Sequence, residues 1–247
     1  MEVLAMTYNN GQTMTLRAPN GHRVRVRFEV NAKARRLILR LDERRREAVA
    51  VAPTRRQIKD AAAFAAERAD WISTRLQHLP EPVRFEEGAT IRYRGEPLML
   101  TAQGEGRLAK IWPEDENSPK LLSVPGDPET MAQRVTRFLK KQAKADLTRS
   151  VKRHCEILGV DFKTISVKDT RSRWGSCTHD GQLSFSWRLI MAPAGVLDYV
   201  AAHECAHLLE MNHSPKFWAK VAKCCPDWKR HRAWLRAHGV ELQSAGE

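Results

Sequence analysis

The sequence is short of several features that define large classes of protein. It has five cysteines, an odd number, and no two of them form a CxxC pair. This usage argues against a disulfide-stapled secreted scaffold and against a structural zinc site built from cysteines, and it favours a reducing compartment. No apolar run approaches the roughly 18 residues of a membrane-spanning helix. The first residues also show no signal peptide, so we expect a cytoplasmic protein without a membrane partner.

The chain does have length and positive charge. Its 247 residues correspond to one large domain or two modest ones. Lys and Arg number 42 against 29 Asp and Glu, which gives a formal net charge of +13. Residues 1–56 carry a balance of +8 and residues 134–153 carry +7, whereas residues 154–215 stand at −2. Such basic segments suit an acidic substrate or a nucleic acid, or they form a solvated surface with no partner.

The first half of the chain predicts strands interrupted by one long helix. Polar and apolar side chains alternate strictly over residues 23–28, which is the period of a half-buried strand. Apolar residues at helical spacing follow over 55–79, before Pro80. Further strand-like runs lie at 37–41, 48–51, 91–93, 98–100 and 121–124. We therefore expect residues 1–126 to form a β-rich N-terminal region with one long helix.

The second half predicts a helix-rich region over residues 127–247. Strands are expected at 164–168 and 183–187. Helices are expected at 128–153, 193–211, 215–224 and 227–238. Because strands and helices are segregated along the chain instead of alternating regularly, the predicted fold class is α+β.

One motif in the second half has the spacing of a catalytic metal site. In His203-Glu204-Cys205-Ala206-His207 the two histidines are four residues apart, so on a helix both imidazoles face the same ion. Neutral imidazole suits Zn²⁺, and Glu204 beside the first ligand is placed to accept a proton from water. The flanking residues 196–202 and 208–209 are apolar nearly all round, which indicates a buried helix. Buried imidazoles and a buried carboxyl need partners. A metal site therefore explains the motif better than a chance HExxH pattern on an exposed helix.

A catalytic zinc site needs a third protein ligand, and His213 is the favoured candidate. A straight helix would carry His213 about 9 Å up the axis from His207 and roughly 120° off its face, so the chain must break first. Asn212 tolerates the left-handed backbone of a helix C-cap, and Pro215 follows shortly, so a break is expected there. The competing candidates for the third ligand are Glu210, Asp227 and His231.

The motif and its surroundings resemble those of one known family, the YgjP-like metallopeptidases. The resemblance covers nearly the whole chain and rests on the blocks RRLILRLDE, ERADWISTRL, RWGSC, WRLIMAP and HECAHLLEMNHSPKFW. This family is similar to the SprT-like and WLM zinc proteases and to the minimal gluzincin-type fold, in which a small sheet packs on the HExxH helix. One departure is Ser186, where the family often has Asn.

The resemblance implies a zinc-dependent hydrolase with one Zn²⁺ per chain. His203, His207 and His213 would be its ligands, and Glu204 would be the general base. In zincin-like folds an edge strand lines the cleft, so Arg173 or His179, on either side of the predicted turn, would stabilise a developing oxyanion. The alternative is that Arg173 only supports a tight, packed turn.

Three functions are compatible with these patterns. The favoured one is a cytoplasmic zinc metallopeptidase that acts on a peptide or protein substrate. An alternative keeps the metal and hydrolyses a nucleotide phosphoanhydride, helped by nearby Arg or Lys. The third, which rests on the net charge of +13, is a nucleic-acid-associated protease or binding module.

Overall fold

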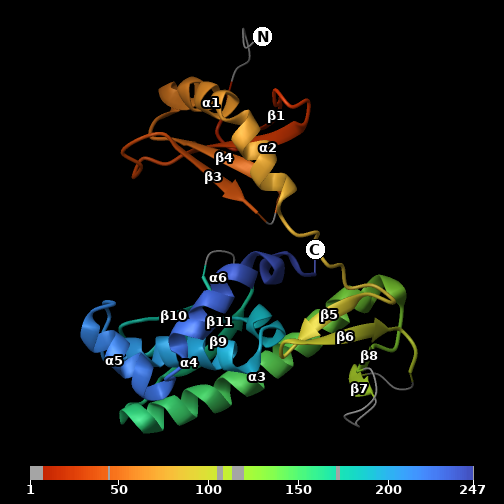
Figure 1. The fold of residues 1–247 in the computed structure, drawn as a ribbon, viewed down its shortest axis with the longest axis vertical. Coiled ribbons are helices and arrows are strands. Elements are labelled where there is room, and N and C mark those ends of the chain that lie inside the picture. Colours follow the sequence, from red (N-terminus) through yellow and green to blue (C-terminus); the bar gives the residue numbers. More distant parts are fainter. Residues whose placement is uncertain (1–7, 44, 105–107, 113–119, 171–172, 247) are drawn as a thin grey trace. The chain divides into compact units, whose positions relative to one another are not determined.

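The computed structural model of the chain (Figure 1) describes residues 8–43, 45–104, 108–112, 120–170 and 173–246. Contacts divide the chain into two compact units, Met1–Pro80 and Glu81–Glu247. Each unit combines helices with small sheets, which confirms the predicted α+β class. Among the helices in the described ranges, none is both long and apolar enough to cross a membrane.

The N-terminal unit is a four-stranded sheet covered on one face by two helices. Its strand order is β1-β2-β4-β3, in which β2 and β4 are parallel and the other neighbours are antiparallel. Small and branched side chains of the sheet and both helices form its core. The elements are β1 (Thr13–Arg17), β2 (Arg23–Val30), β3 (Ile38–Asp42), β4 (Glu47–Ala52), a 3-10 turn η1 (Arg55–Gln57), α1 (Ile58–Glu67) and α2 (Ala69–Gln77).

The single helix expected over residues 55–79 is divided in two at Arg68. The backbone of Arg68 leaves the helical region, with φ −103° and ψ 13°. Its N–H turns back to the Ala65 carbonyl at 3.2 Å, so the last turn of α1 tightens and α2 starts in a new direction. The sequence carries no proline or glycine at this point, so the break was not predicted.

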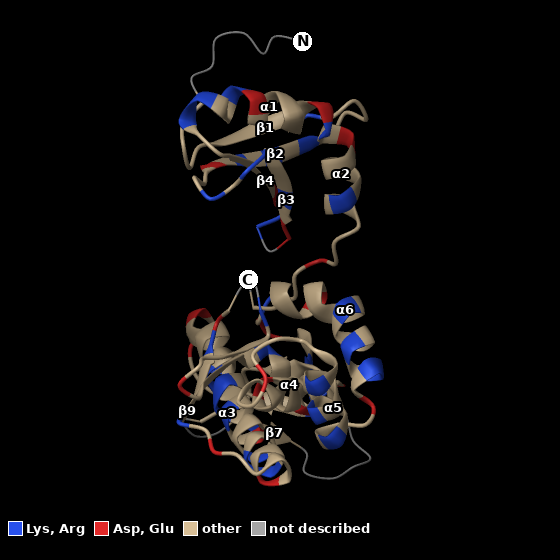
Figure 2. Cartoon of the chain, turned by 90° about the vertical axis from the view of Figure 1, so that its left-hand side faces the viewer, with Lys and Arg blue, Asp and Glu red and all other residues tan. Residues whose placement is uncertain are grey.

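The strand predicted at residues 23–28 is confirmed as β2, and its alternation separates two faces. Val24, Val26 and Phe28 are buried in the core, while Arg23 and Arg25 are exposed on the opposite face. Figure 2 shows Lys and Arg, in blue, on the strands of this unit as well as on its helices. The exposed residues of β2 on the face away from α1 and α2 are therefore arginines.

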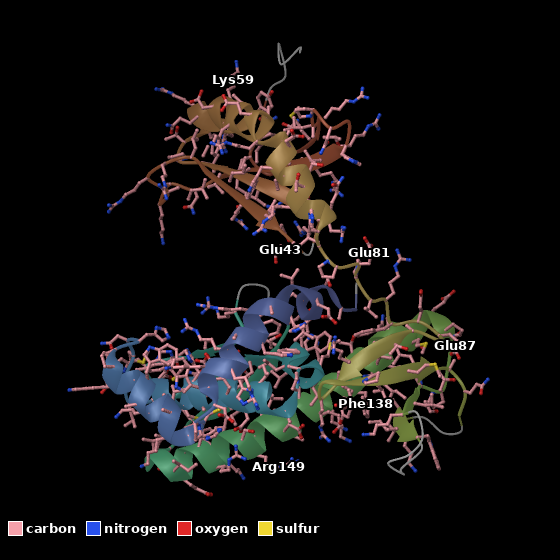
Figure 3. All side chains as sticks on the ribbon, in the orientation of Figure 1. Glu43, Lys59, Glu81, Glu87, Phe138 and Arg149 are labelled. Atoms are coloured by element: carbon pink, nitrogen blue, oxygen red, sulfur yellow. The ribbon has the colours of Figure 1, made fainter. Side chains whose placement is uncertain are left out.

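The second unit begins with another small sheet, of order β5-β6-β8-β7. Its Leu98, Leu100 and Leu122 are buried in one continuous core with the long helix that follows. Phe138 of that helix lies beside the strands (Figure 3), with its ring centroid 6.1 Å from that of Tyr93. The elements are β5 (Thr90–Tyr93), β6 (Glu96–Thr101), β7 (Lys110–Trp112), β8 (Leu121–Ser123), η2 (Pro128–Thr130) and α3 (Met131–Leu158).

This shared core places the division between the units after Pro80, whereas the sequence suggested a cut at residues 126/127. The turn between β5 and β6 is joined to the later part of the chain by backbone hydrogen bonds. The N–H of Arg94 donates to the Ile190 carbonyl at 2.7 Å, and that of Gly95 donates to Met191 at 3.2 Å. A Pro- and Gly-rich stretch at 125–128 is thus a loop inside the unit and not a linker.

The rest of the second unit is a three-stranded sheet and three helices beside α3. The sheet has the order β10-β11-β9, so β10 is an edge strand, and it packs on α4, which also contacts α3, α5 and α6 (Figure 1). The elements are β9 (Thr164–Lys168), β10 (Gly175–Cys177), β11 (Gln182–Ser186), η3 (Trp187–Met191), α4 (Ala194–His207), α5 (Pro215–Cys224) and α6 (Trp228–Ser244).

Candidate metal centre

The helix that carries the HExxH motif is buried, as its apolar flanks predict. Ala201, Ala202 and Cys205 of α4 have no exposed surface, because α4 lies between α3, the three-stranded sheet, α5 and α6. Such a helix is held rigidly on all sides. The backbone positions of His203 and His207, which lie one turn apart on this helix, are therefore fixed.

Three imidazoles meet at the end of α4. One ring nitrogen from each of His203, His207 and His213 lies within 4.8 Å of the others, and the ring centroids are 4.8–5.0 Å apart. The Nε2 atoms of His203 and His213 are separated by 3.1 Å. Two nitrogens bound to one zinc ion at about 2.0–2.1 Å in tetrahedral geometry lie roughly 3.3 Å apart. The arrangement fits a single small ion with imidazole ligands.

His213 reaches this point because α4 ends early. The helix stops at His207, four residues before the expected end, and Leu208 and Leu209 close it with N–H bonds to the carbonyls of Cys205 and Ala206. The break does not use a left-handed Asn212, since that residue is not among the described residues with positive φ. Its side chain instead accepts a hydrogen bond from the N–H of Ser214 at 3.1 Å.

The next helix begins at once and fixes the far side of this turn. The Ser214 hydroxyl accepts the N–H of Phe217, and Pro215 occupies the first position of α5, where no N–H is needed. The ring of Phe217 is fully buried and lies 4.5–4.9 Å from the three imidazoles. The short loop is therefore tied at both ends, with His213 between them.

Burial favours the neutral form of His203 and His207, and a hydrogen bond sets the tautomer of His207. The Nδ1 of His207 lies 3.0 Å from the Glu210 carbonyl oxygen, which can only accept, so Nδ1 carries the proton and Nε2 keeps its lone pair. Burial lowers the pKa of His203 to about 3, assisted by His207, His213 and the charge of Arg232. Burial also lowers the pKa of His207. Neutral imidazole is the form that binds a transition metal.

Glu204 points away from solvent on the same helix. Its side chain is only 5% exposed, and burial raises its pKa to about 8, against the opposing charge of Arg173. The carboxyl group lies directly against the backbone of β10. A Cβ atom added to Gly175 would lie 2.5 Å from Oε1 of Glu204. Only glycine leaves room there for the carboxyl, a constraint that no local pattern in the sequence reveals.

Replacing Gly175 with Ala should therefore displace the Glu204 carboxyl. The added methyl has no space between β10 and α4, both of which are packed, so the carboxyl must move by several tenths of an ångström or more. We expect a loss of hydrolytic activity of about 100-fold with metal stoichiometry unchanged, since a misplacement near 1 Å costs about that much. Ser176→Ala, at the next position, is the matched control. Equal activity in Gly175→Ala and the parent protein would contradict the packing argument.

The other two residues predicted for the site have different positions. Arg173 is exposed just before β10, and its charge acts on Glu204. His179 is exposed in the turn between β10 and β11, and no interaction within the described ranges connects it with the three imidazoles. Ser186 is buried and its hydroxyl accepts the N–H of Arg188 at 3.4 Å, so it caps η3.

Aromatic rings and an arginine lie close to the imidazoles. The Trp218 ring stacks near His213, with centroids 5.9 Å apart, and also on Trp228 at 4.3 Å. The Arg232 guanidinium lies 5.0 Å from the Trp218 centroid. Their helical spacing resembles that of packed side chains. In the sequence, only the short spacing of five residues between His213 and Trp218 indicates that this ring lies near the imidazoles.

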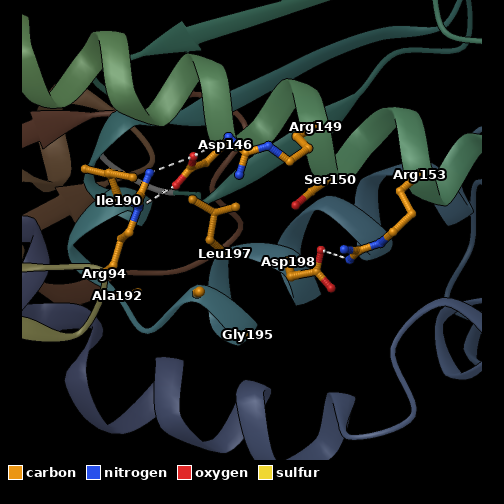
Figure 4. Close-up of a pocket in the computed structure, with 11 residues that line it drawn as sticks. Arg94, Asp146, Arg149, Ser150, Arg153, Ile190, Ala192, Gly195, Leu197 and Asp198 are labelled. Carbon is orange, nitrogen blue, oxygen red and sulfur yellow. Dashed lines mark hydrogen bonds and ion pairs between the residues drawn. The ribbon is translucent and has the colours of Figure 1, made fainter. Parts of the chain in front are cut away.

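A cavity of about 320 Å³ at the other end of α4 is separate from the imidazoles (Figure 4). Arginines and aspartates line it, and Arg94 pairs there with Asp146 at 2.9 Å. Asp198 of α4 binds the buried His154 at 2.9 Å and also Arg153. These contacts hold the first turns of α4 against α3, and so they support the position of the motif further along.

Comparison with known proteins identifies the family of the chain. The family model described as YgjP-like, metallopeptidase domain, matches residues 35–238. No curated protein matches the sequence. A solved structure similar to part of the chain is that of the metallopeptidase zymogen of Pyrococcus abyssi abylysin, at 18% identity and a TM-score of 0.35, covering 37% of this chain and 92% of that one. Since the family model spans most of the sequence, including all three imidazoles, the chain belongs to the YgjP-like metallopeptidase family.

Proposed function

We propose that the protein is a zinc-dependent peptidase with His203, His207 and His213 as the metal ligands. The observation that carries the proposal is the convergence of three imidazole nitrogens within 4.8 Å beside a buried carboxyl. Three neutral nitrogen ligands with no thiolate suit a catalytic zinc ion, which keeps one position open for water or substrate. The expected content is one zinc ion per chain.

The chain's own residues supply the proton transfers of peptide hydrolysis. A zinc ion held by His203, His207 and His213 would supply a Lewis acid, able to polarise the substrate carbonyl and to lower the pKa of water towards ~7. Glu204 accepts the proton of the attacking water at a carboxylate oxygen as the new C–O bond forms. It then gives this proton to the amine nitrogen as the C–N bond breaks. Burial, which raises the pKa of Glu204, brings that pKa closer to the working pH.

Arg173 has a supporting role in this proposal. Its charge reaches the site from the loop before β10, next to Glu204. A cation there stabilises negative charge that develops on the carbonyl oxygen as water attacks. His179 has no comparable support, because it lies exposed in the turn beyond β10.

Metal removal and reconstitution test the proposal. After chelation and dialysis, the protein should not cleave a mixture of unstructured peptides, as followed by mass spectrometry. Cleavage should return as zinc is added and should level off near one equivalent per chain. His203→Ala should remain inactive at that concentration. Peptide cleavage that persists in the metal-free protein, or a chain that never binds zinc, would contradict the proposal.

A specific observation also keeps the phosphoanhydride hydrolase as a second candidate. The charge of Arg232 acts on His203 and that of Arg173 acts on Glu204, and no carboxylate within the described ranges lies within ion-pair distance of either arginine. Guanidinium groups without a carboxylate partner suit phosphate oxygens, which they can bind in bidentate fashion. Release of phosphate or pyrophosphate from nucleoside triphosphates, absent in His203→Ala, would favour this candidate over the peptidase.

A further inference from the structure

The N-terminal unit carries a basic surface that the metal centre does not use. Residues 1–80 contain 16 Lys and Arg against 8 Asp and Glu, so this unit holds most of the net charge of the chain. Along β2, every second side chain is buried in the core, and the arginines between them point to the sheet face opposite α1 and α2. Some of these arginines form ion pairs with carboxylates of the same unit, and others do not.

One part of the face is neutralised by carboxylates. Glu47, only 2% exposed, accepts a hydrogen bond from Arg27 at 2.8 Å and pairs with Arg25 at 3.6 Å. Arg27 also pairs with Asp42 at 3.4 Å and with Glu29. The hydrogen bonds to Glu47 and Glu29 raise the pKa of Arg27, although its partial burial acts in the opposite direction. Arg27 is therefore a structural residue that holds β2, β3 and β4 together.

The edge of the same face is not neutralised. Arg17 of β1 and Arg23 of β2 are direct partners across the antiparallel ladder, and both are exposed. Like charges in this position destabilise a sheet. Within the described part of the chain, neither arginine has a carboxylate within 4 Å. Arg25, next along the row, is 63% exposed and has only the edge of Glu47 as a partner.

The side chains next to these arginines on β1 and β2 argue against an apolar partner. Thr13 and Thr15 pair with Arg27 and Arg25 on the same row, so the edge presents hydroxyl and guanidinium donors. The large apolar side chains exposed in this unit are Ile38 and Trp71, and neither lies on β1 or β2. The described residues of β1 and β2 therefore offer no large exposed apolar side chain to a protein or a lipid, and no exposed ring on which a base could stack.

From this arrangement we infer that the β1–β2 edge, formed by Arg17, Arg23 and Arg25, binds the phosphate backbone of nucleic acid. Guanidinium groups bind phosphate in bidentate fashion, and threonine hydroxyls donate to the same oxygens. Bound phosphate relieves the repulsion between Arg17 and Arg23. Because the contacts reach only the backbone, binding is independent of base sequence and strongly dependent on salt.

The inference can be tested by measuring the affinity of the whole chain for a labelled 20-nucleotide strand and for its duplex by fluorescence anisotropy. We expect Arg17→Ala/Arg23→Ala to weaken binding by at least about tenfold at low salt. The salt dependence, as the slope of log K against log salt, should fall by about 1.4 for the single strand and about 1.8 for the duplex, for two lost phosphate contacts. Arg35→Ala/Arg36→Ala removes the same charge from exposed positions in the loop before β3 and is the matched control.

Two further measurements separate the possible outcomes. The double variant at the β1–β2 edge should melt at the same temperature as the parent or higher, because it removes a like-charge pair, so weaker binding would not reflect unfolding. Vesicles of phosphatidylserine test a membrane surface instead. Equal loss of nucleic-acid affinity in both double variants, binding to vesicles only, or no binding at low salt would each overturn the inference.

Discussion

Replacing Glu204 with Gln should lower kcat for hydrolysis by about 10²–10⁴-fold while the protein still binds one zinc ion. The amide has nearly the shape of the carboxyl and fits the same space against Gly175, but it cannot accept a proton from water. The three imidazoles are unchanged, so metal content, measured by elemental analysis, should not fall. The decisive comparison is therefore activity per bound zinc, measured in parent and variant under the same conditions.

Glu210→Gln is the matched control for this substitution. Glu210 lies on the same segment, but only its backbone carbonyl contacts the site, through the Nδ1 of His207, and the substitution leaves that carbonyl in place. We expect activity within a few-fold of the parent. If Glu204→Gln were fully active, or if it lost zinc along with activity, Glu204 would not be the general base.

The sequence predicted the parts of the site that depend on local spacing. The i, i+4 histidines, the buried helix and the end of that helix before Pro215 follow from periodicity and capping chemistry, which act within a few residues. The exact end was wrong by four residues, because the turn after His207 is closed by Leu208 and Leu209 rather than by a left-handed Asn212. Alternative ends of a helix differ by small free energies, which cannot be read from the pattern of residue types.

The sequence could not predict contacts between distant segments. Gly175 precedes Glu204 by 29 residues, and its role depends on how closely β10 packs on α4. Arg232 reaches Trp218 from α6, and Leu98 and Leu122 join the core of α3, although a Pro-rich loop separates them from it. Glycine in a strand has several structural causes, and aromatic residues at helical spacing are most often core. Only the packed structure distinguishes these cases.

The third metal ligand can be tested by zinc-dependent stabilisation. A ligand that binds only the folded state stabilises it by an amount that grows with the logarithm of its affinity, so zinc should raise the melting temperature of the parent protein strongly. His213 is exposed in the loop between α4 and α5, and its removal should leave the metal-free protein as stable as the parent. We expect His213→Ala to lower zinc affinity by more than about 100-fold, beyond the effect of losing a residue that only orients a ligand. Most of the zinc-induced shift in melting temperature should disappear with it.

His231→Ala and Glu210→Gln complete this experiment, because both residues were alternatives for the same role. His231 lies on α6 against Gly195, at the opposite end of α4 from His207, and Glu210 offers the site a backbone oxygen. Both variants should keep the zinc-induced shift of the parent. A shift that survives in His213→Ala but is lost in one of these two would reassign the third ligand to that residue. Loss in His213→Ala alone would mean that the short loop after α4, and not the helix itself, completes the metal centre.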